Sequence, residues 1–187
     1  MDDVALLERV RRGDTDAAST LFARHQGVIY RYAAHMCGWD AADDVVQETF
    51  LAVLLRSGQY DAARGSVANY LFGIARHFVL KRLGSRYDDM YDGNGDEQLA
   101  MIEASQPTVL DSLTRAETIG TVRAAIASLP PAYREVVALC ELEEMSYEAA
   151  ACVVQCPVGT IRSRLHRARA LLVTKLSAVH PPAGIRK

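Results

Sequence analysis

A short helix, a tight turn and a basic helix follow one another near the carboxyl end of this chain, between Ser146 and Leu172. Ser146 is a favourable N-cap for the first of these helices, because its hydroxyl can accept a hydrogen bond from a free backbone N–H. Gln155 and Cys156 leave room only for a tight turn, and Pro157 suits the first turn of the next helix. This order is typical of a helix-turn-helix, whose second helix enters the major groove of DNA.

The second of these helices has two contrasting faces. Its apolar stripe follows a helical spacing and consists of Ile161, Leu165, Ala168 and Leu172. The opposite face carries Arg162, Ser163, His166 and Arg167. Because no Asp or Glu occurs after Glu148, nothing on this part of the chain repels phosphate. The pattern therefore predicts contact with DNA, and a helix hairpin with solvated arginines is the alternative.

Charge is unevenly distributed along the 187 residues, although the net charge is only −2. Residues 86–111 contain one basic residue, Arg86, and seven acidic residues: Asp88, Asp89, Asp92, Asp96, Glu97, Glu103 and Asp111. An acidic middle and a basic end imply separate tasks. Half of the residues are hydrophobic, which allows a packed core and excludes global disorder.

Nearly every other segment repeats its apolar residues at helical spacing, and none alternates with the period of two typical of a strand. The sequence predicts helices at about 2–12, 15–37, 41–56, 67–83, 113–129, 132–143, 146–154 and 157–172. We therefore expect an all-α protein of two small helical domains, residues 1–85 and 113–180, the second containing the helix-turn-helix. A flexible acidic linker at 86–112 should join them.

Nothing in the sequence predicts export or membrane insertion. The first residues are acidic and lack the apolar region of a signal peptide, and no apolar run approaches the roughly 20 residues that span a bilayer. We therefore expect a cytoplasmic protein, whose cysteines stay reduced. These cysteines, Cys37, Cys140, Cys152 and Cys156, are expected to be small buried hydrophobic residues rather than a metal or redox site.

The predicted helix at 41–56 has an acidic outer face. Its inward residues should be Val46, Phe50, Val53 and Leu54. Asp44, Gln47 and Glu48 then share the outer face. An amide between two carboxylates suits a basic, hydrogen-bonding partner surface. A solvated acidic face without a partner is the alternative.

Two parts of the chain resemble bacterial sigma factors of the extracytoplasmic-function group. The first is residues 22–54, with Phe22-Ala-Arg-His-Gln-Gly-Val-Ile-Tyr-Arg-Tyr-Ala and Asp43-Asp-Val-Val-Gln-Glu-Thr-Phe-Leu. The second is residues 129–169, with Leu129-Pro-Pro-Ala-Tyr-Arg-Glu-Val-Val, Met145-Ser-Tyr-Glu-Ala-Ala and Gly159-Thr-Ile-Arg-Ser-Arg-Leu-His-Arg-Ala-Arg. The order and spacing of these motifs, with an acidic segment between them, match that group.

The resemblance implies three contacts. The first domain would dock on core RNA polymerase, with Asp44, Gln47 and Glu48 matching the residues that meet the basic coiled coil of the largest subunit. The second would read the −35 promoter element as duplex through Arg162, Ser163, His166 and Arg167, with Arg169 and Lys175 near phosphates. The segment from Tyr60 to Leu83 would open and read the −10 element.

A melted −10 element needs aromatic rings for base stacking and basic groups along the backbone. The candidates are Tyr60, Arg64, Asn69, Tyr70, Phe72, Arg76, His77, Lys81 and Arg82, and the loop Asp61–Asn69 is expected to capture bases. Two positions depart from the family, which usually has Trp where Tyr70 stands and Asn where His77 stands. The alternative is that Tyr70, Leu71, Ile74 and Phe78, which follow a helical spacing, are core residues and do not contact DNA.

We therefore expect a promoter-specificity subunit without an active site, cofactor or metal, held by an anti-sigma factor as is common in the group. No nucleophile–base pair or metal-ligand constellation in the sequence supports an enzyme. The alternative from another class is a stand-alone helix-turn-helix regulator with an amino-terminal sensing domain. Such a regulator would bind duplex DNA as a dimer without polymerase.

Overall fold

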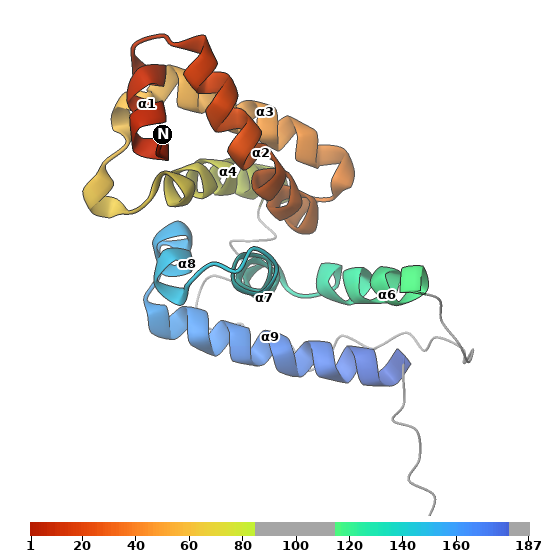
Figure 1. Cartoon of the computed structure of the whole chain (residues 1–187). Coiled ribbons are helices and arrows are strands. Elements are labelled where there is room, and N and C mark those ends of the chain that lie inside the picture. The colour runs from red at the N-terminus through yellow and green to blue at the C-terminus, as the bar shows by residue number, and fades with distance from the viewer. Residues whose placement is uncertain (85–114, 180–187) are drawn as a thin grey trace, which may run out of the picture.

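The computed structural model describes residues 1–84 and 115–179, and within these ranges the chain forms eight α-helices and no strand (Figure 1). The predicted all-α class is confirmed. We call residues 1–84 the first block and residues 115–179 the second block. The acidic segment predicted as a linker, 86–112, lies outside the described residues.

The first block contains α1 (Asp3–Arg11), α2 (Thr15–Cys37), α3 (Trp39–Arg56) and α4 (Val67–Leu83). The starts of α1, α2 and α4 lie close to the predicted positions, because a side chain caps the first turn of each helix. The carboxylate of Asp14 accepts from the backbone N–H of Ala17, and the hydroxyl of Ser66 accepts from that of Asn69. The predicted break at 38–40 is shorter than expected, since Gly38 alone, at φ 95°, ends α2 and Trp39 already begins α3.

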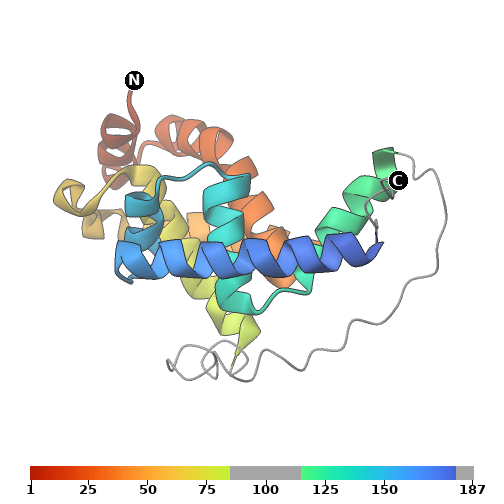
Figure 2. The same ribbon diagram turned by 90° about the horizontal axis from the view of Figure 1, so that it is seen from below.

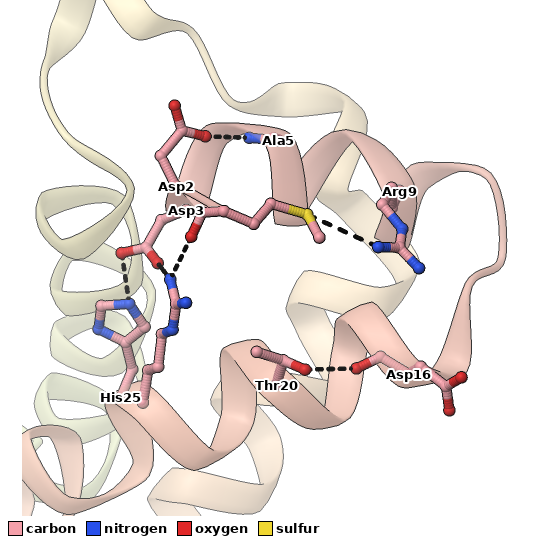
Figure 3. Close-up of polar contacts among 9 residues, drawn as sticks. Asp2, Asp3, Ala5, Arg9, Asp16, Thr20 and His25 are labelled. Atoms are coloured by element: carbon pink, nitrogen blue, oxygen red, sulfur yellow. Dashed lines mark hydrogen bonds and ion pairs between the residues drawn. The ribbon is translucent and has the colours of Figure 1, made fainter.

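Polar contacts around Asp3 fasten α1 to α2 (Figure 3). One carboxylate oxygen of Asp3 accepts from Arg24 and the other pairs with Nε2 of His25, each at 2.8 Å. The neighbouring Asp2 caps α1 by accepting from the N–H of Ala5. The contacts of Asp3 therefore tie the start of α1 to the middle of α2.

The second block contains α6 (Arg115–Ala127), α7 (Pro131–Val137), α8 (Tyr147–Val154) and α9 (Val158–Val179). The helix predicted at 132–143 is α-helical only as far as Val137 and continues as a π-helical turn, η4 (Ala138–Leu142). The last helix extends seven residues beyond the predicted Leu172, because the half-buried Leu176 prolongs its inner stripe.

The helix-turn-helix of α8 and α9 is confirmed. Ser146 caps α8, with its hydroxyl accepting from the N–H of Ala149 at 3.1 Å. Gln155 adopts the left-handed conformation at φ 60° and turns the chain, and α9 begins one residue after Pro157. The predicted stripe of α9 is inside: Ile161, Leu165 and Ala168 are at most 1% exposed.

Most of the predicted inward positions on α3 are buried, but the prediction for Leu54 is wrong. Val46, Phe50 and Val53 lie in the core, whereas Leu54 is 54% exposed. It lies at the edge of the core, where it lines a small apolar pocket together with Phe22 and Val53. The apolar side of α6 is also partly open, since Ile119 and Val122 are exposed whereas Ile126 is buried.

The two blocks pack against each other through α2 and α4 on one side and α7 and α8 on the other (Figures 1 and 2). In both views α9 lies on the side of the second block that faces away from the first block. The outer face of α9 therefore points away from the block interface.

A matched pair of leucines tests the burial pattern. Leu71→Ala removes a fully buried side chain of α4 and should lower the free energy of unfolding by about 2–5 kcal/mol. Leu55→Ala changes a side chain that is 75% exposed and should shift it by no more than about 0.5 kcal/mol. Urea unfolding followed by circular dichroism measures both, and equal losses would contradict the assigned core.

Candidate functional site

The outer face of α3 carries the predicted acidic residues. The side chain of Asp44 is 70% exposed, and Gln47 is also exposed. Glu48 is held by Arg82 of α4, whose Nη1 donates to Glu48 at 2.6 Å, while Nη2 lies 3.9 Å from Asp44. Arg82, predicted to lie along the −10 element, is thus a partner of the acidic face. It orients Glu48 and leaves the carboxylate of Asp44 open to a partner.

Leucines continue this face one step further along α3. Leu51, Leu54 and Leu55 are 57%, 54% and 75% exposed. Each follows one of the three acidic-face residues by seven positions, so the two sets share one side of the helix. The sequence interpretation missed this extension because it assigned Leu54 to the core. An exposed face that is acidic at one end and apolar at the other is suited to a partner helix with basic and apolar residues.

A cavity of about 580 Å³ lies beside α4 and the loop before it. Five of the nine residues predicted to bind the −10 element line it together: Tyr60, Arg64, Asn69, Tyr70 and His77. Arg56 and Gln59, which the sequence interpretation did not single out, line it as well, and Cys152 and Gln155 of α8 complete the lining. The predicted aromatic and polar groups are therefore gathered in one concave site.

The rings of Tyr60 and Tyr70 form a pair in this cavity, with centroids 5.6 Å apart. Each hydroxyl donates to a backbone carbonyl at 3.1 Å, Tyr60 to Gly65 and Tyr70 to Arg56, which fixes the ring orientations. Burial raises the pKa of Tyr70, so the ring stays neutral. Gly65 has φ 138°, and a Cβ there would lie 3.0 Å from the side chain of Asn69, so the loop requires glycine.

Arg76 and Lys81, two of the other −10 candidates, lie apart from this cavity lining, and a third, Phe72, is buried in the core. Lys81 is exposed near the end of α4. The side chain of Arg76 is only 11% exposed, and its Nε donates to Glu135 of α7 at 2.8 Å. The carboxylate of Glu135 is fully buried and also accepts from the hydroxyl of Tyr32 at 3.0 Å. Sequence reasoning gave Glu135 no role, although it directly precedes the apolar run 136–140, where a carboxylate that becomes buried needs a partner.

The outer face of α9 carries the predicted polar residues in exposed positions: Arg162, Ser163, His166 and Arg167. The hydroxyl of Ser163 donates to the carbonyl of Thr160 at 3.1 Å. Arg169 was expected to contact a phosphate. In this structure its guanidinium donates to Glu141 at 2.5 Å. Lys175 is half-buried further along the helix. The open basic surface is therefore concentrated in the first half of α9.

Comparison with known proteins covers both blocks. The family model of sigma-70 region 2 matches residues 21–87, and that of sigma-70 region 4 matches residues 119–172. The RNA polymerase sigma-H factor of Pseudomonas aeruginosa is 36% identical over 183 residues, which cover 89% of this chain and 90% of that protein. The ECF RNA polymerase sigma-E factor of Escherichia coli is 32% identical over 186 residues, covering 94% of this chain and 95% of that protein.

The chain belongs to the extracytoplasmic-function sigma factors. As a sigma factor it is a promoter-specificity subunit of RNA polymerase and not an enzyme. The region 2 match gives no support to the alternative of a stand-alone regulator. Within residues 1–84 and 115–179, no helix combines the length and the apolar composition needed to cross a bilayer.

Two solved structures resemble this sigma factor. CnrH in complex with the cytosolic domain of CnrY superposes with a TM-score of 0.68 at 25% identity, covering 94% of this chain and 97% of CnrH. RpoE of Bartonella quintana in complex with the anti-sigma factor NepR gives a TM-score of 0.63 at 23% identity, covering 85% of this chain and 96% of that chain. The second likeness shows the fold alone.

The cysteines of the sigma factor are less buried than the sequence predicted, since Cys37, Cys140 and Cys156 are only half-buried. Cys152 is exposed, whereas it was expected to be buried. It lies on the side of α8 that borders the cavity, so the helix does not bury it against α9. Cys140 is half-buried, and desolvation together with the carboxylate of Glu141 raises its pKa to about 11.

Thiol labelling tests this difference. At pH 8 we expect Cys152 to react first with an aromatic disulfide reagent, because it is accessible, and Cys140 to react slowly, because almost none of it is thiolate. Cys152→Ser should remove the fast phase of the reaction, and the matched Cys140→Ser should leave that phase unchanged. A fast phase that survives in Cys152→Ser would contradict the assignment.

Proposed function

We propose that this sigma factor mounts on core RNA polymerase through α3, reads the −35 element as duplex through α9, and reads the −10 element as melted strand through α4 and the loop before it. The observation that carries the proposal is one chain with an open acidic face on α3 and an open basic face on α9. These two charges suit a basic protein surface and DNA phosphates respectively.

The polymerase contact would join α3 to the basic coiled coil of the largest subunit. Asp44 is the most open carboxylate of this face and would meet a lysine or arginine. Glu48 is already oriented by Arg82 and would share its second oxygen with the partner. The exposed Leu51 and Leu55 would be buried on docking and add apolar area to the charge pairing.

Recognition of the −35 element would use the exposed start of α9 in the major groove. Arg162 and Arg167 have the fork geometry that binds guanine O6 and N7, a contact that discriminates by about 1–3 kcal/mol. Ser163 and His166 lie between them as further contacts to base edges or phosphates. Arg169, paired with Glu141, would lie at the edge of this contact.

Recognition of the −10 element would use the cavity beside α4. Strand separation costs free energy, which stacking on aromatic rings and contact with basic groups can offset. The paired rings of Tyr60 and Tyr70 supply the stacking surface, and Arg64 and Asn69 supply polar contacts on the loop. Arg76 and Lys81 would follow the strand backbone, which requires Arg76 to leave Glu135.

Two further parts of the proposal concern organisation and control. We assign residues 1–85 and 113–180 to separate domains and 86–112 to the acidic linker between them. An anti-sigma factor is the expected inhibitor, as is common among extracytoplasmic-function sigma factors. A polymerase subunit acts where transcription occurs, so we place the protein in the cytoplasm.

Charge reversal on α3 tests the polymerase contact. Asp44→Arg should weaken binding to purified core polymerase at least about tenfold, because it places like charges in contact. Glu8→Arg on α1 is the matched control and should bind core normally, since it disrupts only an exposed pair with Arg11. Fluorescence anisotropy measures the affinity of each variant for core polymerase. An unchanged affinity of Asp44→Arg would refute the assignment of this face.

Truncation on α9 tests the −35 contact. Arg162→Ala should leave core binding intact and reduce discrimination between a −35 element and a mutated one by about 1–3 kcal/mol. Arg12→Ala, an exposed arginine of the first block, serves as the matched control. Footprinting of the assembled holoenzyme reports the upstream contact, and an unaltered footprint would count against Arg162.

A further inference from the structure

Two short helical turns connect the α4 cavity to the end of α1. They are η1 (Ser57–Gln59) and η2 (Ala62–Arg64), and both contribute residues to the cavity lining. The first of these turns, η1, also packs against α1. A Cβ added at Gly58, in the middle of η1, would lie 3.8 Å from Nη2 of Arg11, the last residue of α1. The guanidinium of Arg11 therefore lies against η1 but outside the cavity lining.

Positive charge continues along this connection. Arg64 lines the cavity, and so does Arg56, which directly precedes η1. Both residues are exposed, and the side chain of Arg11 is 41% exposed. Between residues 51 and 83 the sequence has five basic residues and a single acidic residue, Asp61, whose carboxylate caps η2 by accepting from a backbone N–H of that turn. A row of arginines thus leads from the cavity across η1 to the end of α1.

Arg11 is held only by a weak surface pair. Its Nη1 donates to the carboxylate of Glu8 at 2.7 Å, and the Glu8 side chain is 49% exposed. Because exposed pairs of this kind stabilise little, a phosphate oxygen can replace the carboxylate. Arg9, on the same helix, is directed elsewhere, since its guanidinium pairs with Asp14 at 2.6 Å and reaches the sulfur of Met1 (Figure 3). Arg11 is therefore placed to meet an anion at η1, and Arg9 is a comparable arginine that is not.

We propose that the melted promoter strand, on leaving the α4 cavity, runs across η1, and that Arg11 binds a phosphate of its backbone. This inference rests on the proposed function of the cavity and adds a path for the strand beyond the −10 element. Phosphate contacts position a strand without reading its sequence, so Arg56 and Arg11 would fix the register in which the cavity reads bases. Gly58 adds no side chain to the surface that the strand would cross.

Holoenzyme assembled from core polymerase and the full-length chain provides the test. A −10 element selected by transcription from a randomised promoter library is placed in three fluorescent single strands. One probe ends at the element, and the other two continue for about six nucleotides beyond one end or the other. Arg11→Gln is compared with the matched control Arg9→Gln, since the two arginines are 41% and 43% exposed and each has one carboxylate partner. Circular dichroism verifies that each variant keeps its helical content.

The binding of these probes should depend on Arg11 in one direction only. We expect one extension to tighten binding to the wild type, and Arg11→Gln to weaken binding of that probe alone by about two- to fivefold. Loss of one phosphate contact should also lower the slope of log Kd against log salt by about 0.7 for that probe. Glu8→Gln frees Arg11 from its carboxylate and should tighten binding of the same probe by up to about fivefold. Arg9→Gln should match the wild type on every probe.

Two results would overturn the path across η1. The first is an Arg11→Gln variant that binds both extended probes as tightly as the wild type does. The second is an equal loss on the short and the extended probes, which would place the effect of Arg11 on core polymerase or on folding instead of on the extended strand. Failure of the proposed function would appear separately, as a short probe that wild-type holoenzyme binds no more tightly than a scrambled sequence.

Discussion

Burial of one apolar stripe on each helix fixes which polar side chains face outward, and the function of this sigma factor depends on that constraint. Ile161, Leu165 and Ala168 hold α9 against its block, so Arg162 and Arg167 on the opposite side of the helix are exposed. The same geometry on α3 buries Val46 and Val53 and turns Asp44 outward. Each recognition surface is thus the reverse side of a packed helix, which gives it a rigid support.

The features that depend on local periodicity could be predicted from the sequence. The helix-turn-helix follows from the Ser146 cap, the turn at Gln155 and the stripe of α9. The acidic face of α3 follows from spacing as well, whereas the role of Tyr60 and Tyr70 was expected from the family resemblance and from their aromatic rings. Long-range partners could not be predicted, because Arg82 meets Glu48 and Arg76 meets Glu135 across 34 and 59 residues. Leu54 was misplaced for a related reason, since periodicity does not show where a neighbouring helix ends its contact.

Run-off transcription with purified core polymerase and a library of templates randomised across both promoter elements is the most direct measurement of this account. We predict that adding the chain produces transcripts whose start sites lie downstream of one recurring pair of elements, and that core alone produces none of them. Transcripts that do not require the chain, or that share no upstream pair of elements, would contradict the central claim.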